Sequence, residues 1–163
     1  LTAELGPMQA NGSLSAAESH AWHRPLLAKR ASQYDPRVRS RIERGATMSA
    51  SDYIDLLNAR QHWIVRMEAA LAPYDALLSP TVPLVAPPIA DVAPGAQRDA
   101  EFFRVNALLL RNTSVVNMLD GCALSLPCHM AGELPVGLMV WHGALHDDAV
   151  LNVGLQIEQI LQK

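Results

Sequence analysis

The chain has 163 residues, half of them hydrophobic and 18% charged, and its formal net charge is -3. A chain of this size and composition can bury a core, which excludes an intrinsically disordered protein. The small negative charge offers no basic surface for nucleic acid, and no apolar stretch is long enough to cross a bilayer, so we predict neither a nucleic-acid partner nor a membrane span.

The chain is expected to begin with a loop followed by a helix. Residues 1–14 show no hydrophobic periodicity and contain two glycines and a proline, so we expect a loop or a disordered terminus. Ser15 begins a capping-box pattern that predicts a helix over 15–32, which Pro25 should kink or split. The side chains expected on the buried stripe of this helix are Trp22, Leu26 and Leu27.

Two further helices are predicted before residue 73. A short helix over 36–44 should stop at Gly45 through a glycine cap, and Ser49 can cap a longer helix that ends at Pro73. Arg60 interrupts the apolar stripe of the longer helix, so we expect it either to brace the structure through a paired charge or to bind an anion. The apolar positions of that stripe are Tyr53, Leu57, Ile64, Met67 and Leu71.

Strands and helices alternate in the rest of the chain, which predicts an α/β layered protein. The high density of prolines between Pro73 and Pro94 excludes a helix there and favours an extended segment. The elements expected after Pro73 are a short strand over 76–78, a helix over 99–118, two strands over 123–126 and 136–141, and a final helix over 147–161.

The helix predicted over 99–118 is unusually polar on one side. Buried amides and hydroxyls need partners, so this side should meet backbone groups, ordered water or a ligand. The polar residues concerned are Asn106, Asn112, Thr113, Ser114 and Asn117.

The sequence contains no convincing nucleophile with its base. Ser125 and His129 are separated by Pro127, and no third residue is placed to orient the histidine, so a catalytic dyad is not favoured. Cys122 and Cys128 are too few for a disulfide scaffold, and we expect reduced, buried thiols in a cytoplasmic protein.

Two histidine groups could in principle hold a metal, but neither matches a full zinc motif, so surface or capping roles are favoured. No glycine-rich phosphate cradle is present either, and we predict no metal and no cofactor. An arginine cluster near residue 40 is interpreted as a solvated face rather than a phosphate or carboxylate patch. The histidine groups are His20 with His23, and His142 with His146, Asp147 and Asp148; the arginines are Arg37, Arg39, Arg41 and Arg44.

Several segments, in order and at the expected spacing, resemble the amidase signature family from about Ser15 to the end of the chain. The most specific is Asn117-Met118-Leu119-Asp120-Gly121-Cys122-Ala123-Leu124-Ser125-Leu126-Pro127. Two departures are His129, where glycine is usual, and Met139, where glutamine is common. The other matching segments are Tyr34 to Val38 with Gly45, Ser51 to Tyr53 with Arg60, Tyr74 to Pro83, Leu134 to Leu138, and Asp147-Asp148.

This resemblance implies part of a mixed β-sheet sandwiched between helices, with residues 1–163 forming a single-domain C-terminal portion of an amidase. Family members hydrolyse carboxamide C–N bonds with a nucleophilic serine, a second serine after a cis peptide and a lysine, all in a Gly/Ser-rich core upstream of the region matched here. The lysines of this chain, Lys29 and Lys163, are not near such a core. No catalytic residue can therefore be assigned, and the chain alone is expected to be inactive.

By the same resemblance, the chain supplies part of a substrate funnel. Asn112, Thr113, Val116 and Asn117 are then candidate substrate-binding residues, with sheet bracing as the alternative role. The expected partners are the missing N-terminal core or a complementary chain, a small-molecule amide, and further copies of the chain. The alternative function is a non-catalytic binding or assembly module derived from the amidase fold.

Overall fold

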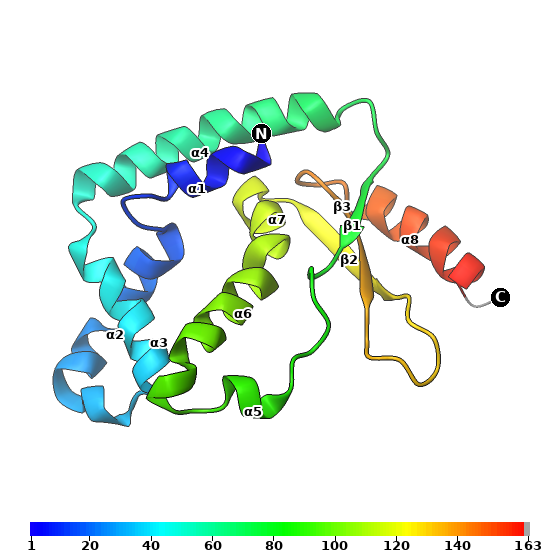
Figure 1. Ribbon diagram of the computed structural model, residues 1–163. Coiled ribbons are helices and arrows are strands. Elements are labelled where there is room, and N and C mark those ends of the chain that lie inside the picture. The colour runs from blue at the N-terminus through cyan, green and yellow to red at the C-terminus, as the bar shows by residue number, and fades with distance from the viewer. Residues whose placement is uncertain (162–163) are drawn as a thin grey trace. The chain divides into compact units, whose positions relative to one another are not determined.

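A computed structural model describes residues 1–161, and Lys163, one of the two lysines considered above, lies outside the described residues. The fold is mixed α/β, as predicted (Figure 1). The chain divides into two compact units, Leu1–Trp63 and Ile64 onward, and each is described by itself. That residues 1–163 act as a single domain remains a prediction. Within residues 1–161, no helix is both long and apolar enough to cross a membrane.

The expected loop over residues 1–14 is a correction, because the segment is partly helical. A 3-10 turn, η1 (Thr2–Glu4), leads into the one-turn helix α1 (Leu5–Met8). Contacts distant in sequence hold the segment: the Trp63 indole donates to the Leu1 carbonyl at 3.0 Å, and the Asn11 amide donates to Asp52 Oδ1 at 3.1 Å. Local sequence carries no signal for such contacts, which is why the periodicity argument missed them.

The next helix, α2 (Leu14–Arg30), forms where predicted but faces differently. Its N-cap is Ser13, whose hydroxyl accepts from the Ala16 N–H at 3.2 Å, and the helix is continuous through Pro25. The buried stripe is wrong, because Trp22 is 71% exposed and Leu26 40% exposed. The side of α2 that approaches its neighbours carries Ala16 and His20, and Trp22 lies on the opposite side of the helix.

Helix α3 (Pro36–Glu43) begins at Asp35, whose carboxylate accepts from the Arg37 and Val38 N–H groups. It does not stop at a glycine cap, because the chain continues through Gly45 as the 3-10 turn η3 (Arg44–Thr47). Glycine is required there for another reason: a Cβ at position 45 would overlap the Ala16 carbonyl oxygen of α2.

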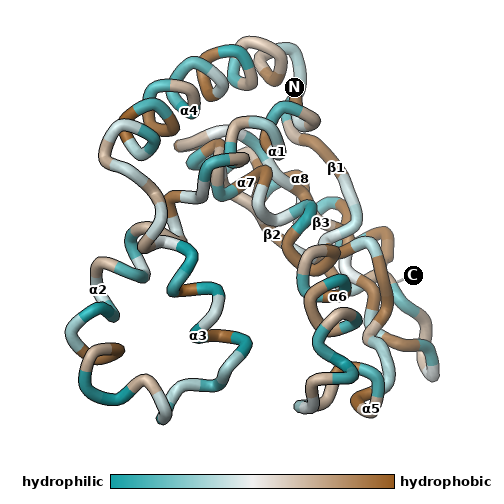
Figure 2. Tube along the Cα trace, turned by 60° about the vertical axis from the view of Figure 1, so that its left-hand side comes forward, coloured by the Kyte–Doolittle hydropathy of each residue, from teal (hydrophilic) through white to brown (hydrophobic). Residues whose placement is uncertain are grey.

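Helix α4 (Ala50–Leu71) begins with the predicted cap. The Ser49 hydroxyl accepts from the Asp52 N–H at 3.0 Å, and the Asp52 carboxylate accepts from the Ser49 N–H at 3.2 Å. Of the predicted stripe, Leu57 is 40% exposed, whereas Arg60 is half-buried and has a partner. Hydrophobic and hydrophilic residues alternate along its turns (Figure 2), and the buried ones are Leu56, Trp63, Ile64, Met67 and Leu71.

Three strands form one antiparallel sheet in the order β1-β3-β2: β1 (Leu77–Pro80), β2 (Cys122–Pro127) and β3 (Gly137–His142). The predicted strands are therefore confirmed within one to three residues at their ends. The final helix α8 (Asp147–Leu161) has the predicted bounds and packs against β2 and β3 (Figure 1). The core between α8 and the sheet contains Leu126, Val140 and Val150, with Cys122, Leu124, Val153 and Ile157 packed around them.

The segment between β1 and β2 differs from its prediction in two places. A one-turn helix, α5 (Ile89–Val92), and a 3-10 turn, η4 (Ala96–Arg98), interrupt the proline-rich stretch that we expected to be free of helix. The single helix expected over 99–118 is two helices, α6 (Asp99–Arg111) and α7 (Thr113–Leu119), separated at Asn112. The helix α7 ends at Asp120, whose backbone is left-handed with φ 61°.

Candidate functional site

The three segments that most resemble the amidase signature converge at one end of the sheet. Thr81 follows β1, Ser125 lies on β2 and Gly137 begins β3. The Thr81 N–H donates to the Gly137 carbonyl at 2.8 Å, and the hydroxyls of Thr81 and Ser125 are hydrogen-bonded at 2.6 Å. We call Thr81, Ser125 and Gly137 the hydroxyl cluster.

Gly137 is what allows the two hydroxyls to meet. A Cβ at this position would lie 2.6 Å from both Thr81 Oγ1 and Ser125 Oγ, closer than real Cβ contacts allow. Any larger residue would therefore separate the two side chains or displace β3. The Val136-Gly137-Leu138 motif thus has a steric cause in this fold.

Asn112 fixes the end of β1 beside this cluster. Its side-chain Nδ2 donates to the Pro80 carbonyl at 2.7 Å, across 32 residues of sequence, and its Oδ1 accepts from Arg111 Nε at 3.3 Å. Both ends of the amide are therefore engaged within the chain. This geometry is the one expected of a bracing residue, and a substrate contact by Asn112 remains a prediction.

The other three predicted site residues lie along α7. Thr113 is half-buried and its hydroxyl is 3.4 Å from the Leu110 carbonyl. Val116 is 6% exposed and lies close to the Gly121 backbone, whereas Asn117 is exposed. The structure therefore brings only Asn112 to the sheet, and the substrate-binding role of Thr113, Val116 and Asn117 stays untested.

Sequence reasoning missed Ser79 and Trp141, which share the face of the hydroxyl cluster. Ser79 pairs with Met139 and Trp141 pairs with Leu77, so both side chains project from the sheet face opposite α8. Among residues 1–161, Ser79 Oγ and Trp141 Nε1 are the buried side-chain polar atoms without a hydrogen-bond partner. The available signal was the alternation that puts hydroxyls at 79 and 81 on one side of the chain.

The cluster has no activating base. Ser125 bonds Thr81 rather than His129, and His129 Nδ1 accepts from the Val136 N–H at 3.4 Å. Cys128 is exposed and Cys122 is half-buried, so the prediction that both thiols are buried is wrong. In residues 1–161, no three His, Cys, Asp or Glu side chains are arranged to hold a metal ion. The arrangement can therefore position groups but cannot generate a nucleophile unaided.

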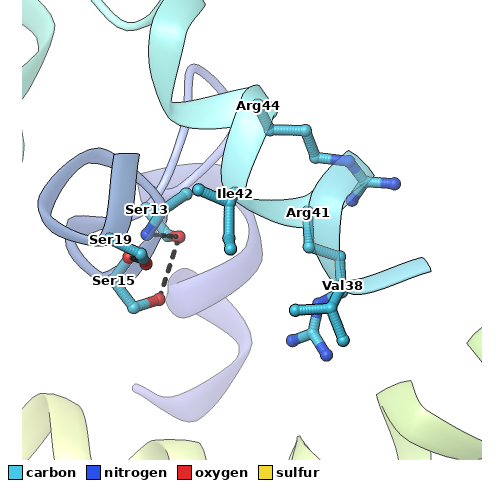
Figure 3. Close-up of a pocket in the computed structure, with 8 residues that line it drawn as sticks. Ser13, Ser15, Ser19, Val38, Arg41, Ile42 and Arg44 are labelled. Carbon is cyan, nitrogen blue, oxygen red and sulfur yellow. Dashed lines mark hydrogen bonds between the residues drawn. The ribbon is translucent and has the colours of Figure 1, made fainter. Parts of the chain in front are cut away.

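A pocket of about 320 Å³ in the first unit joins the N-terminal end of α2 to α3. Ser13, Ser15 and Ser19 line one side, and Arg41 and Arg44 the other. In Figure 3, Ile42 lies between the serines and the two arginines, and Arg44 extends away from the hydroxyls. The guanidinium groups and the hydroxyls do not converge on one point, so this pocket does not form a combined anion site.

The model of the Amidase family matches residues 2–151. The chain belongs to the amidase family. A 2-amino-5-chloromuconic acid deaminase from Comamonas testosteroni is 26% identical over 151 residues, which are 92% of this chain and 32% of that protein. A glutamyl-tRNA(Gln) amidotransferase component from Salinispora tropica is 30% identical over 141 residues, 83% of this chain and 27% of the relative.

Solved structures agree with the family assignment. A crystal structure of an amidase is 27% identical, with a TM-score of 0.69, and covers 88% of this chain. The S177A allophanate hydrolase of Kluyveromyces lactis is also 27% identical, with a TM-score of 0.68 and 83% of the chain covered. This chain matches 33% and 22% of those two chains, so it spans a third or less of the relatives and structures compared.

Proposed function

We propose that this chain is the C-terminal portion of an amide C–N hydrolase, in which it completes the sheet and forms part of the substrate funnel. The nucleophile and its proton relay come from polypeptide outside these 163 residues. The substrate is a small carboxamide, and the catalytic core is the partner that this chain requires.

The convergence of Thr81, Ser125 and Gly137 at one end of the sheet carries this proposal. These residues come from the three segments that resemble the family most, and they meet in a structured, hydrogen-bonded arrangement. They nevertheless lack any base or relay lysine, since Lys29 lies in α2 of the other unit. A structured but chemically incomplete site is what a supporting portion of an enzyme would contain.

The unpartnered polar atoms on the same sheet face give independent support. Leaving a buried donor without an acceptor costs about 1–3 kcal/mol, so folded proteins usually avoid it. Ser79 Oγ and Trp141 Nε1 lack partners among residues 1–161, and both project from the face of the hydroxyl cluster. Further polypeptide against this face would supply the acceptors.

The test compares this chain with the longer protein encoded by its reading frame. We expect the longer protein to release ammonia from simple amides and the 163-residue chain to release none. A fluorophosphonate probe, followed by mass spectrometry, should label a serine outside these residues. Ammonia release or serine labelling in the isolated chain would contradict the proposal, as would a reading frame that starts at Leu1.

The site residues are tested in the active longer protein. Asn112→Ala removes the bond to the Pro80 carbonyl and should lower kcat/KM about tenfold by loosening the funnel wall. Asn106→Ala is the matched control, because Asn106 lies on α6 and makes no such bond to the sheet. Equal kinetics for both variants would remove Asn112 from the site.

A further inference from the structure

A second pocket, of about 400 Å³, lies at the opposite end of β3 from Gly137. It is formed by the C-terminal end of α4, the segment before β1, the end of β3 and the residue before α8. The lining residues are Glu68, Ala72, Tyr74, His142, Gly143 and His146. Its volume is within the usual range for small-ligand sites.

His142 forms an uncharged wall of this pocket. It is 4% exposed, and the Gly143 N–H donates to its Nδ1 at 2.7 Å, so the ring proton is on Nε2. That Nε2 then donates to the Tyr74 carbonyl at 3.2 Å. The ring of His146 stacks on His142 with the centroids 3.9 Å apart. Because both His142 nitrogens are engaged, the residue offers a ring face rather than a metal-binding atom.

The polar groups of the remaining lining favour positive charge. Among residues 1–161, the Glu68 carboxylate and the Tyr74 hydroxyl have no hydrogen-bond or ion-pair partner, and no lysine or arginine lines the pocket. The last turn of α4 has no basic residue, so the negative end of its dipole, close to Ala72, has no basic side chain beside it. Aromatic and imidazole faces beside a carboxylate attract cations electrostatically.

We propose that this pocket binds a small organic ammonium ion, with Glu68 as the counter-ion and the His146 and Tyr74 rings as the surrounding faces. The proposal does not depend on the amide-hydrolase function, because the pocket and the hydroxyl cluster lie at opposite ends of β3.

The test is an NMR titration of the 163-residue chain with benzylammonium at about pH 8, above the ordinary pKa of imidazole. We expect the imidazole C–H signals of His142 and His146 to shift with a Kd in the millimolar range, and those of His20 to stay in place. Benzyl alcohol, which has the same ring without the charge, should bind at least tenfold more weakly. No shift at the two histidines, or equal binding of the alcohol, would overturn the proposal.

Variants assign the binding to the pocket. Glu68→Gln should raise the Kd about tenfold, whereas Glu158→Gln, an exposed carboxylate on α8, should leave it unchanged. His146→Ala, at an exposed position, should weaken binding about threefold and serves if the Glu68 variant does not fold. Unchanged affinity in both pocket variants, or shifts caused by Zn²⁺ but not by benzylammonium, would count against the ammonium site.

Discussion

At the scale of single residues, the smallest side chain in the sheet has the largest steric role. Gly137 does not have a left-handed backbone, so it is not required for its conformational freedom. It is required because the Thr81 and Ser125 hydroxyls occupy the space that a side chain would fill. Backbone geometry alone would therefore misjudge this position.

We predict that Gly137→Ala destabilises the chain by about 2 kcal/mol, because overpacking forces neighbouring groups to shift. Urea unfolding followed by circular dichroism measures the change. Gly6→Ala is the matched control, since no atom lies within 4 Å of the added Cβ, and it should change stability by less than about 0.5 kcal/mol. Adding Ser125→Ala to the Gly137 variant should restore part of the loss, and strict additivity would contradict the steric account.

At the scale of elements, α4 is fixed at its start by a reciprocal cap. The Ser49 hydroxyl, the Ser49 N–H and the Asn11 amide, in that order of importance, lower the pKa of the Asp52 carboxyl below its ordinary value. The ionised form is therefore the one that the fold prefers. This preference links the start of α4 to the N-terminal segment through Asn11.

The lowered pKa of Asp52 predicts an acid-dependent contribution to stability. A carboxyl with a lowered folded pKa stabilises the fold above its unfolded pKa, about 3.9, and the effect disappears as pH falls through the folded value. The difference in unfolding free energy between the native chain and Asp52→Asn should therefore be constant near neutral pH and shrink below about pH 4. In a Ser49→Ala background the pH-dependent part should be smaller. A difference that grows on acidification would refute the linkage.

Most element types could be predicted from sequence, because their signals are local. Asp147 and Asp148 mark the start of α8, and the Ser49 cap marks the start of α4. The failures came from information that local sequence does not carry. The orientation of α2 depends on Gly45 meeting Ala16, and the bond between Asn112 and Pro80 spans 32 residues. The candidate site was therefore only partly visible: its motifs could be found, but not the contacts that join them.

At the scale of the whole molecule, α4 has buried residues in both compact units. Leu56 and Trp63 belong to the first unit, and Ile64, Met67 and Leu71 to the second. Unfolding either unit would remove support from part of one continuous helix. The two units are therefore expected to unfold together, although contacts are concentrated within each.

Tryptophan fluorescence can test this coupling, because the buried residues Trp63 and Trp141 lie in different units. We predict that variants retaining only Trp63 or only Trp141, with the other tryptophans replaced by phenylalanine, have coincident urea midpoints when each is corrected for its own loss of stability. A variant retaining only Trp22 should be readily quenched by acrylamide, since this side chain is 71% exposed. Midpoints that remain separated would indicate independent domains.

The close approach at Gly137 also constrains how this fold can change over time. Positions 81, 125 and 137 share one small volume, so a gain of side-chain atoms at one must be matched by a loss at another. In homologous chains with the same strand register, alanine or serine at the position of Gly137 should accompany glycine or alanine at the position of Thr81 or Ser125. The three positions would then vary as one unit of inheritance rather than as three independent sites.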